Sequence, residues 1–459
     1  MFLKFAGWIR QARESNELHF SSILPEQTIT ECFSATSRIQ RSDTVYTLPA
    51  MVWMFLNQVL SADHSCRETV ARLNAWRISR GKSPVSADTG RYCTVRDRFD
   101  GAGCQRLVER TARQIDAQAP ESWRWQGRQV FVVDGTTVTM PDTPKNQDEY
   151  PQQCNQKPGC GQPIMRLVAM FSLATGVVLR LAMGPCRGKQ TAENSSFRDQ
   201  MADELNHGDV LLADRFFSGW FDIALLHARG VEVVVRKNQV RHSDFRRGRR
   251  LGSGDHLIRW FKPKRPEWMD QATYDSLPQF LTLREVRVIV RQKGFRSREV
   301  IVATTLWNHN DFPASAIADL YRRRWDAEIN LRSLKTHMQM EHLRCKTPHR
   351  VRNEIRMHAL ACNLIRGTMA SAAIEANLKP WQISFKGTVQ TLNQYLPISL
   401  TATDIPTWIR QLFKAIAKHV VGNRPNRVEP RVRKRRPKPY PLMHKPRNEL
   451  RKRLPLKGI

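Results

Sequence analysis

The spacing of hydrophobic residues changes near residue 120, and this change divides the chain into regions of different structure. Before it, apolar residues recur every three or four positions, as in 47–61 and 63–77, which predicts helices. Beyond it, the chain has short apolar runs rich in β-branched residues, which are typical of buried strands. These runs lie at 130–138, 164–173, 177–181, 209–214 and 231–235. Helical patterns at 191–205 and 219–229 separate the later runs, so the sequence predicts a mixed α/β sheet.

A basic segment interrupts this alternation of strands and helices. Residues from about 237 to 300 are rich in arginine and have hairpin-like patterns, including a turn at 292–294. We expect a β-rich insertion there. After it, long helices are predicted from Asp311 to about Gln339 and from about 351 to 377.

The chain is therefore expected to have four parts. They are a helical N-terminal region over 1–120, an α/β region over 121–345 that contains the insertion at about 237–300, a helical C-terminal region over 346–422, and a basic proline-rich tail over 423–459.

Net charge narrows the class of partner. The 459 residues include 74 Lys and Arg against 42 Asp and Glu, which gives a formal net charge of +32. Such an excess disfavours the compact state unless a polyanion neutralises it, so nucleic acid is the expected partner. An anionic membrane surface is the alternative. The tail alone holds 14 Lys and Arg, two acids and seven prolines, and we expect a phosphate-binding arm, with a solubilising tail as the alternative.

Other features indicate a cytoplasmic protein that associates with the nucleoid. The sequence has no run of 18 apolar residues, so no membrane span is expected. Its first residues lack the long apolar stretch of a signal peptide. The nine cysteines are scattered and odd in number, which is typical of reduced thiols.

Two aspartates end predicted strands. Asp134 follows an apolar run that begins at Val130, and Asp214 follows another that begins at Asp209. Ligand sites in open α/β sheets lie at the carboxyl ends of strands, so both side chains are candidates for chemistry. Each alone is weak evidence, because aspartate is a common strand terminator.

A stripe of polar residues is predicted along one face of the helix that follows the insertion. At 100° per residue, Tyr321, Arg324, Glu328 and Lys335 share a narrow arc, and Arg332 extends it. Apolar residues flank the stripe on both sides, namely Leu320, Leu331 and Met338 on one and Trp325 and Ile329 on the other. Buried charge needs partners, so we expect this face to be functional. A salt-bridge ladder on a solvated face is the alternative. Opposite the stripe, Asp326, Asn330 and Ser333 are expected to face solvent.

Together these elements supply the ligands of a metal centre. Asp134, Asp214 and Glu328 provide hard carboxylate oxygens, which suit a pair of Mg²⁺ ions, with Mn²⁺ as a substitute. Two such ions activate a water or a 3′-hydroxyl and stabilise the leaving oxygen of a phosphodiester. Arginine and lysine on the same helix face would hold neighbouring phosphates. Tyr321 could hydrogen-bond a phosphate or stack on a base.

The spacing of these residues resembles that of bacterial insertion-sequence transposases of the IS4 type, which are DDE transposases. Their signature on the last helix is Tyr, two residues, Arg, three residues, Glu, six residues, Lys, and every gap matches here from Tyr321 to Lys335. The first acid of such proteins lies in an Asp-Gly-Thr block, as Asp134 does. The second lies in an Ala-Asp-Arg block, as Asp214 does.

This resemblance implies an RNase H-like catalytic domain over about 121–345 with a β-rich insertion. It implies that Asp134, Asp214 and Glu328 are the catalytic metal ligands. It implies binding of terminal inverted repeats, for which region 1–120 is the expected reader, and then cut-and-paste movement by a dimer on DNA. Packing of region 1–120 as a helical cap is the alternative. Arg215 is expected to contact DNA or to pair with an acid.

One departure from the resemblance concerns base flipping, and two other functions are alternatives to transposition. In such relatives an aromatic residue ahead of the last helix can hold a flipped base, but 299–303 has none and Trp307 comes a few residues late. A nuclease on the same fold would cut DNA without joining it. A domesticated or decayed copy would bind DNA without catalysis.

Overall fold

The computed structural model describes residues 23–33, 39, 45–188, 191–289, 299–398, 404–422 and 441–452. The turn expected at 292–294 and most of the basic tail lie outside these residues. Within the described ranges, no helix is long and apolar enough to cross a membrane.

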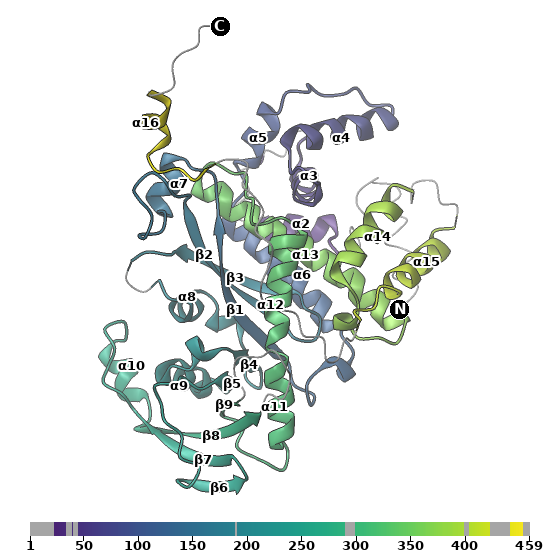
Figure 1. Cartoon of the computed structure of the whole chain (residues 1–459). Helices are drawn as coiled ribbons and strands as arrows, with labels where there is room; N and C mark the ends of the chain where they lie inside the picture. Colours follow the sequence, from purple (N-terminus) through teal and green to yellow (C-terminus); the bar gives the residue numbers. More distant parts are fainter. Residues whose placement is uncertain are drawn as a thin grey trace.

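A nine-stranded mixed sheet forms the centre of the structure, with the strand order β3-β2-β1-β4-β5-β9-β8-β7-β6 (Figure 1). Strands β1, β4 and β5 run parallel. Strand β2 is antiparallel to β1, and β3 is antiparallel to β2, so β3 runs in the same direction as β1. The bounds of these five strands are β1 Val130–Thr139, β2 Ile164–Ser172, β3 Val178–Pro185, β4 Val210–Ala213 and β5 Glu232–Arg236. This arrangement confirms the predicted mixed α/β class.

The basic segment after β5 continues the same sheet. Strand β9 (Glu299–Thr304) pairs antiparallel with β5, and β8 (Phe280–Ile289), β7 (Asp255–Phe261) and β6 (Arg249–Gly252) follow outward. A short helix, α10 (Gln271–Ser276), lies between β7 and β8. The insertion strands therefore extend the edge of the sheet away from β1.

Helices cover both faces of the sheet, because its central strands are apolar on both sides. On β1, Val130 and Val132 belong to one buried cluster, and Phe131 and Val133 belong to the other. The second cluster includes residues of α8 (Glu193–Gln200) and α9 (Trp220–Ala228). The first includes residues of α12 (Trp325–Arg332) and of the long helix α13 (Pro348–Glu375).

Helices α3, α6, α14 and α15 pack against α13 (Figure 1). Helix α6 (Gly101–Ala117) packs against both α13 and β3, and α3 (Leu48–Leu60) packs against α13. Thr47 caps α3, because its hydroxyl accepts a hydrogen bond from the Ala50 amide. The other helices are α2 Glu26–Phe33, α4 Cys66–Ser79, α5 Gly90–Arg96, α7 Pro144–Glu149, α14 Phe385–Ile398, α15 Ile405–Ala417 and α16 Arg447–Lys452.

The long helix predicted from Asp311 to about Gln339 is interrupted. It consists of α11 (Ala314–Arg322) and α12, and a π-helical turn over Ser333–His337 follows α12. The break lies at Arg323 and Arg324, where backbone hydrogen bonds span three residues instead of four. The Arg324 amide, for example, donates to the Tyr321 carbonyl. Tyr321 thus belongs to α11, and Glu328 belongs to α12.

The prediction that Asn330 and Ser333 face solvent is wrong. Both are buried, whereas Trp325 and Ile329 are 46% and 40% exposed. The reason lies in α13: Arg366 donates a hydrogen bond of 2.6 Å to Asn330 Oδ1, which satisfies the buried amide. The Ser333 hydroxyl donates to the Ile329 carbonyl at 3.0 Å, so α12 can bury this polar face.

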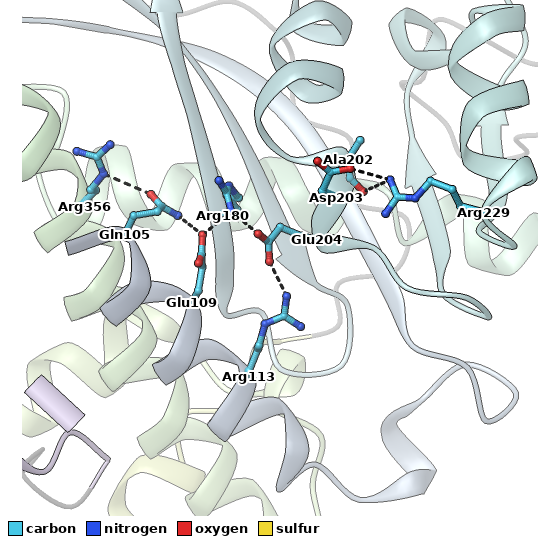
Figure 2. A network of polar contacts seen from close by, with 9 residues as sticks. All are labelled: Gln105, Glu109, Arg113, Arg180, Ala202, Asp203, Glu204, Arg229 and Arg356. Carbon is cyan, nitrogen blue, oxygen red and sulfur yellow. Dashed lines mark hydrogen bonds and ion pairs between the residues drawn. The ribbon is translucent and has the colours of Figure 1, made fainter. Parts of the chain in front are cut away.

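A network of ion pairs ties α6 to the sheet and to the segment before β4 (Figure 2). Arg180 of β3 lies between Glu109 of α6, at 2.8 Å, and Glu204, which also pairs with Arg113. The network continues through Gln105 to Arg356 of α13. Arg180 therefore joins three elements that are distant in sequence.

We predict that Arg180→Met destabilises the protein by about 2 kcal/mol, between the costs typical of an exposed and a buried ion pair. The reason is that Glu109 and Glu204 would lose a shared cation while their side chains are only 16% and 14% exposed. Urea unfolding followed by circular dichroism measures the change. The matched control is Arg229→Met, because Arg229 pairs with the fully exposed Asp203. Equal midpoints for both variants would contradict a structural role for Arg180.

Candidate active site

The two aspartates lie on neighbouring parallel strands. Val132 of β1 is paired with Leu212 of β4, so continuing the register by two residues brings Asp134 level with Asp214. The prediction that both aspartates end strands is correct for Asp214, which directly follows β4, and wrong for Asp134, because pairing with β2 continues β1 to Thr139. Their carboxylates interact electrostatically, since the charge of Asp214 raises the pKa of Asp134.

Burial is the main influence on Asp134. It raises the pKa of this carboxyl to about 6, against the opposing charge of Arg324. The charges of Asp214 and Glu328 raise the pKa further. The Gly135 amide donates a hydrogen bond of 2.9 Å to Asp134 Oδ1 and holds the side chain in place.

Asp214 is held by the turn that follows it. Its Oδ1 accepts a hydrogen bond of 2.8 Å from the Phe216 amide, at the start of a short 3₁₀ turn. Burial raises its pKa, and the cations Arg324, Arg215 and Arg236 oppose that shift. The Asp214 carboxylate therefore lies in a largely desolvated place with three arginines around it.

The Arg324 guanidinium contacts the carboxylates of both Glu328 and Asp134. Its guanidinium Nη2 lies 2.8 Å from Glu328 Oε1, and its Nη1 lies 3.7 Å from Asp134 Oδ2. The guanidinium is only 15% exposed, so it offsets carboxylate charge where water is scarce. A single cation thus joins an acid of the sheet to an acid of α12.

The other residues of the predicted stripe lie in different places. Burial raises the pKa of Tyr321 to about 12. The charge of Arg324 lowers this pKa and the charge of Asp214 raises it, so the Tyr321 hydroxyl lies near both groups. Lys335 is fastened to β1: its ammonium donates to Thr136 Oγ1 at 3.1 Å and to the Thr137 carbonyl at 2.9 Å. Arg332 is exposed on α12.

Arg215 points outward next to Asp214. It is exposed, its guanidinium lies 5.4 Å from the ring centre of Phe216, and it donates to Gln239 Oε1 at 3.4 Å. Phe216 itself is 60% exposed. An exposed guanidinium and an exposed aromatic ring therefore directly follow the second acid in sequence.

Two charged residues that the sequence analysis did not single out also reach these acids. Arg236 ends β5 and lowers the pKa of Asp214. Glu193 begins α8, and a Cβ built on Gly135 would lie 2.1 Å from its carboxyl carbon. A side chain at position 135 would therefore displace the Glu193 carboxylate from this place. Sequence carries little signal for either residue, because only the folded sheet brings them near Asp134 and Asp214.

The donor set fits a hard divalent cation. Its half-buried carboxylates are oxygen ligands of the kind that Mg²⁺ and Mn²⁺ take. In this arrangement, no three His, Cys, Asp or Glu residues of the described chain are close enough together to hold one ion. The Arg324 guanidinium occupies the cationic position between Asp134 and Glu328. Arg324 must therefore move before both acids can share an ion.

Comparison with known proteins places this site in a family. Residues 125–364, more than half of the chain, match the family model described as "Transposase DDE domain". The chain is 25% identical over 438 residues to "Transposase InsG for insertion sequence element IS4" of Escherichia coli (strain K12), covering 92% of this chain and 93% of that protein. It is also 25% identical over 203 residues to "Putative transposase InsZ" of the same organism, covering 43% and 63%.

A solved structure with an overall likeness is the "Cryo-EM structure of piggyBac transposase synaptic complex with hairpin DNA (SNHP)". Its TM-score is 0.42 at 11% identity, with 86% of this chain and 84% of that chain covered, and a likeness of this level carries no argument. The family match and the strand order together confirm the RNase H-like class. The resemblance to IS4-type transposases is likewise confirmed. The chain belongs to the transposase DDE domain family, and it is an enzyme of the DDE transposase class.

Proposed function

We propose that this transposase binds the terminal inverted repeats of an insertion sequence and catalyses metal-dependent strand cleavage and strand transfer, in cut-and-paste movement. The observation that carries the proposal is the approach of Asp134 and Glu328 to one guanidinium, with Asp214 on the strand next to Asp134. Partly buried carboxylates that gather in one place need cations to offset their charge. Phosphodiester chemistry is what a pair of such cations performs.

In this proposal Asp134, Asp214 and Glu328 are the catalytic metal ligands. Bound Mg²⁺, with Mn²⁺ as a substitute, would activate a water or a 3′-hydroxyl and stabilise the leaving oxygen. Asp134 must first lose its proton, since burial raises its pKa to about 6. Glu328 must exchange its ion pair with Arg324 for the metal.

The cations around the acids are proposed to hold DNA phosphates. Arg324 would pass from Glu328 to a phosphate, where its planar guanidinium can bind two oxygens. Arg215 and Arg332 are exposed, so a DNA backbone could reach both. Tyr321 would donate its hydroxyl to a phosphate. Lys335 has two of its hydrogen bonds on β1, so it would both position the strand and reach DNA with its remaining N–H.

Two copies are proposed to act together on paired ends, with DNA as the partner and association with the nucleoid. The helical N-terminal region over 1–120, which includes α2 to α6, is proposed as the reader of the ends. Among the alternatives, a nuclease on this fold would use the same acids, so only joined DNA products separate it from a transposase. A copy that only binds DNA would yield neither excised nor joined DNA.

Glu328→Gln is predicted to abolish cutting and leave end binding intact, because it removes a metal ligand and keeps the side-chain shape. We expect cleavage to fall by more than about 100-fold, the upper range for loss of an outer-shell metal partner. A plasmid carrying the gene's own flanking DNA, with Mg²⁺, reports excised and joined fragments. The matched control is Asp319→Asn, which removes an exposed acid from α11. Cutting by Glu328→Gln would show that the third acid is misassigned.

Cleavage is predicted to depend on the protonation of Asp134. Its pKa is raised to about 6, so the metal-binding carboxylate is lost as the pH falls through that value. At limiting Mg²⁺ the rate should therefore drop between pH 7 and 5, and saturating Mg²⁺ should move the drop to lower pH. The measurement is single-turnover cleavage at several pH values, and a flat profile at limiting Mg²⁺ would argue against Asp134 as a ligand.

Deletion of residues 423–459 is predicted to weaken DNA binding and flatten its salt dependence, since 14 Lys and Arg are removed. Binding measured at several salt concentrations gives the slope. A tail of equal length with glutamine at those 14 positions is the control, and it should behave like the deletion. An unchanged slope in both would return the tail to a solubilising role.

A further inference from the structure

A fourth carboxylate lies against Gly135, the residue that follows the first acid of the site. Glu193 is the first residue of α8. This helix packs on one face of the sheet, against β2 and β3, and β2 is the neighbour of β1. A Cβ on Gly135 would lie 2.1, 2.3 and 2.5 Å from the carboxyl carbon and the two carboxyl oxygens of Glu193. The carboxylate therefore lies against the backbone of the residue that follows Asp134.

The surroundings of Glu193 leave its charge poorly compensated. Burial raises its pKa, and the charge of Asp214 raises it further. Arg166 opposes these effects, but its Nη1 donates to the Thr191 carbonyl at 2.6 Å. Within the described part of the chain, no Lys or Arg lies within 4.0 Å of the Glu193 carboxylate. A half-buried acid without an ion pair costs free energy unless a cation joins it.

We propose that Glu193 is a further residue of the catalytic centre, a fourth carboxylate that helps to hold the divalent cations next to Asp134 and Asp214. This inference rests on the proposed function. It also gives the glycine of the Asp-Gly-Thr block a testable role, because a side chain at position 135 would displace the Glu193 carboxylate.

A purely structural role is the rival explanation. An acid in the first turn of a helix interacts favourably with the helix dipole, and Glu193 occupies that position in α8. Such a role needs neither burial nor contact with Gly135, and an exposed side chain would serve it equally well. It predicts a change in stability upon substitution but none in metal affinity, so the two explanations differ in a measurable way.

The test is Mn²⁺ binding by the full-length protein, followed by electron paramagnetic resonance of the free ion, with and without a duplex of the gene's flanking DNA. We expect Glu193→Gln to weaken Mn²⁺ binding about 10- to 100-fold. Asp134→Asn is the positive control. Asp199→Asn is the matched control, because it removes an acid that is 57% exposed from the same helix.

A second variant guards against misfolding. Gly135→Ala leaves the charge of Glu193 intact but moves its carboxylate, so it should weaken Mn²⁺ binding too. The double variant Gly135→Ala with Glu193→Gln should lose less affinity than the sum of the single losses, because both changes remove one interaction. Additive losses would show that the two residues act independently and would overturn the inference.

The outcomes separate this inference from the proposed function. If Asp134→Asn loses Mn²⁺ affinity while Glu193→Gln and Gly135→Ala bind as the wild type does, Glu193 is structural and only this inference fails. If Asp134→Asn binds Mn²⁺ as the wild type does, or the wild type binds none, the proposed metal centre fails and this inference with it. Parallel losses in Glu193→Gln and Asp134→Asn, with Asp199→Asn unchanged, support the fourth carboxylate.

Discussion

Mutual repulsion of partly buried carboxylates is the constraint on which the site depends. Asp134 and Asp214 lie level on neighbouring strands, and Glu328 approaches from α12, so the charges of Asp214 and Glu328 both raise the pKa of Asp134. The guanidinium of Arg324 offsets this repulsion by contacting both Asp134 and Glu328. Because a cation is required to offset the repulsion between these carboxylates, the site is suited to bind metal ions.

The scaffold around the site keeps α12 against β1. Lys335 ties the turn after α12 to Thr136 and Thr137, and Arg366 of the buried helix α13 holds Asn330 on the opposite face. These polar contacts span distant parts of the chain, so the position of Glu328 depends on the whole core. These contacts leave Glu328 of α12 facing Arg324, whereas Arg332 is exposed to solvent.

Sequence predicted the parts of the site that depend on local pattern. Apolar runs placed Asp134 and Asp214 at strands, and helical spacing placed Arg324 and Glu328 on one face. It failed where tertiary contacts decide: Asn330 is buried because a distant arginine satisfies it. Glu193 went unnoticed for the same reason, since no local pattern relates the start of a helix to the glycine of another strand.

The most direct test of the account is a crystal structure of the protein with Mn²⁺ and a DNA end, with the ions located by anomalous scattering. The account predicts Mn²⁺ bound by Asp134, Asp214 and Glu328, with Arg324 moved from Glu328 to a phosphate. Mn²⁺ bound elsewhere, or Arg324 still paired with Glu328 beside a bound ion, would contradict it.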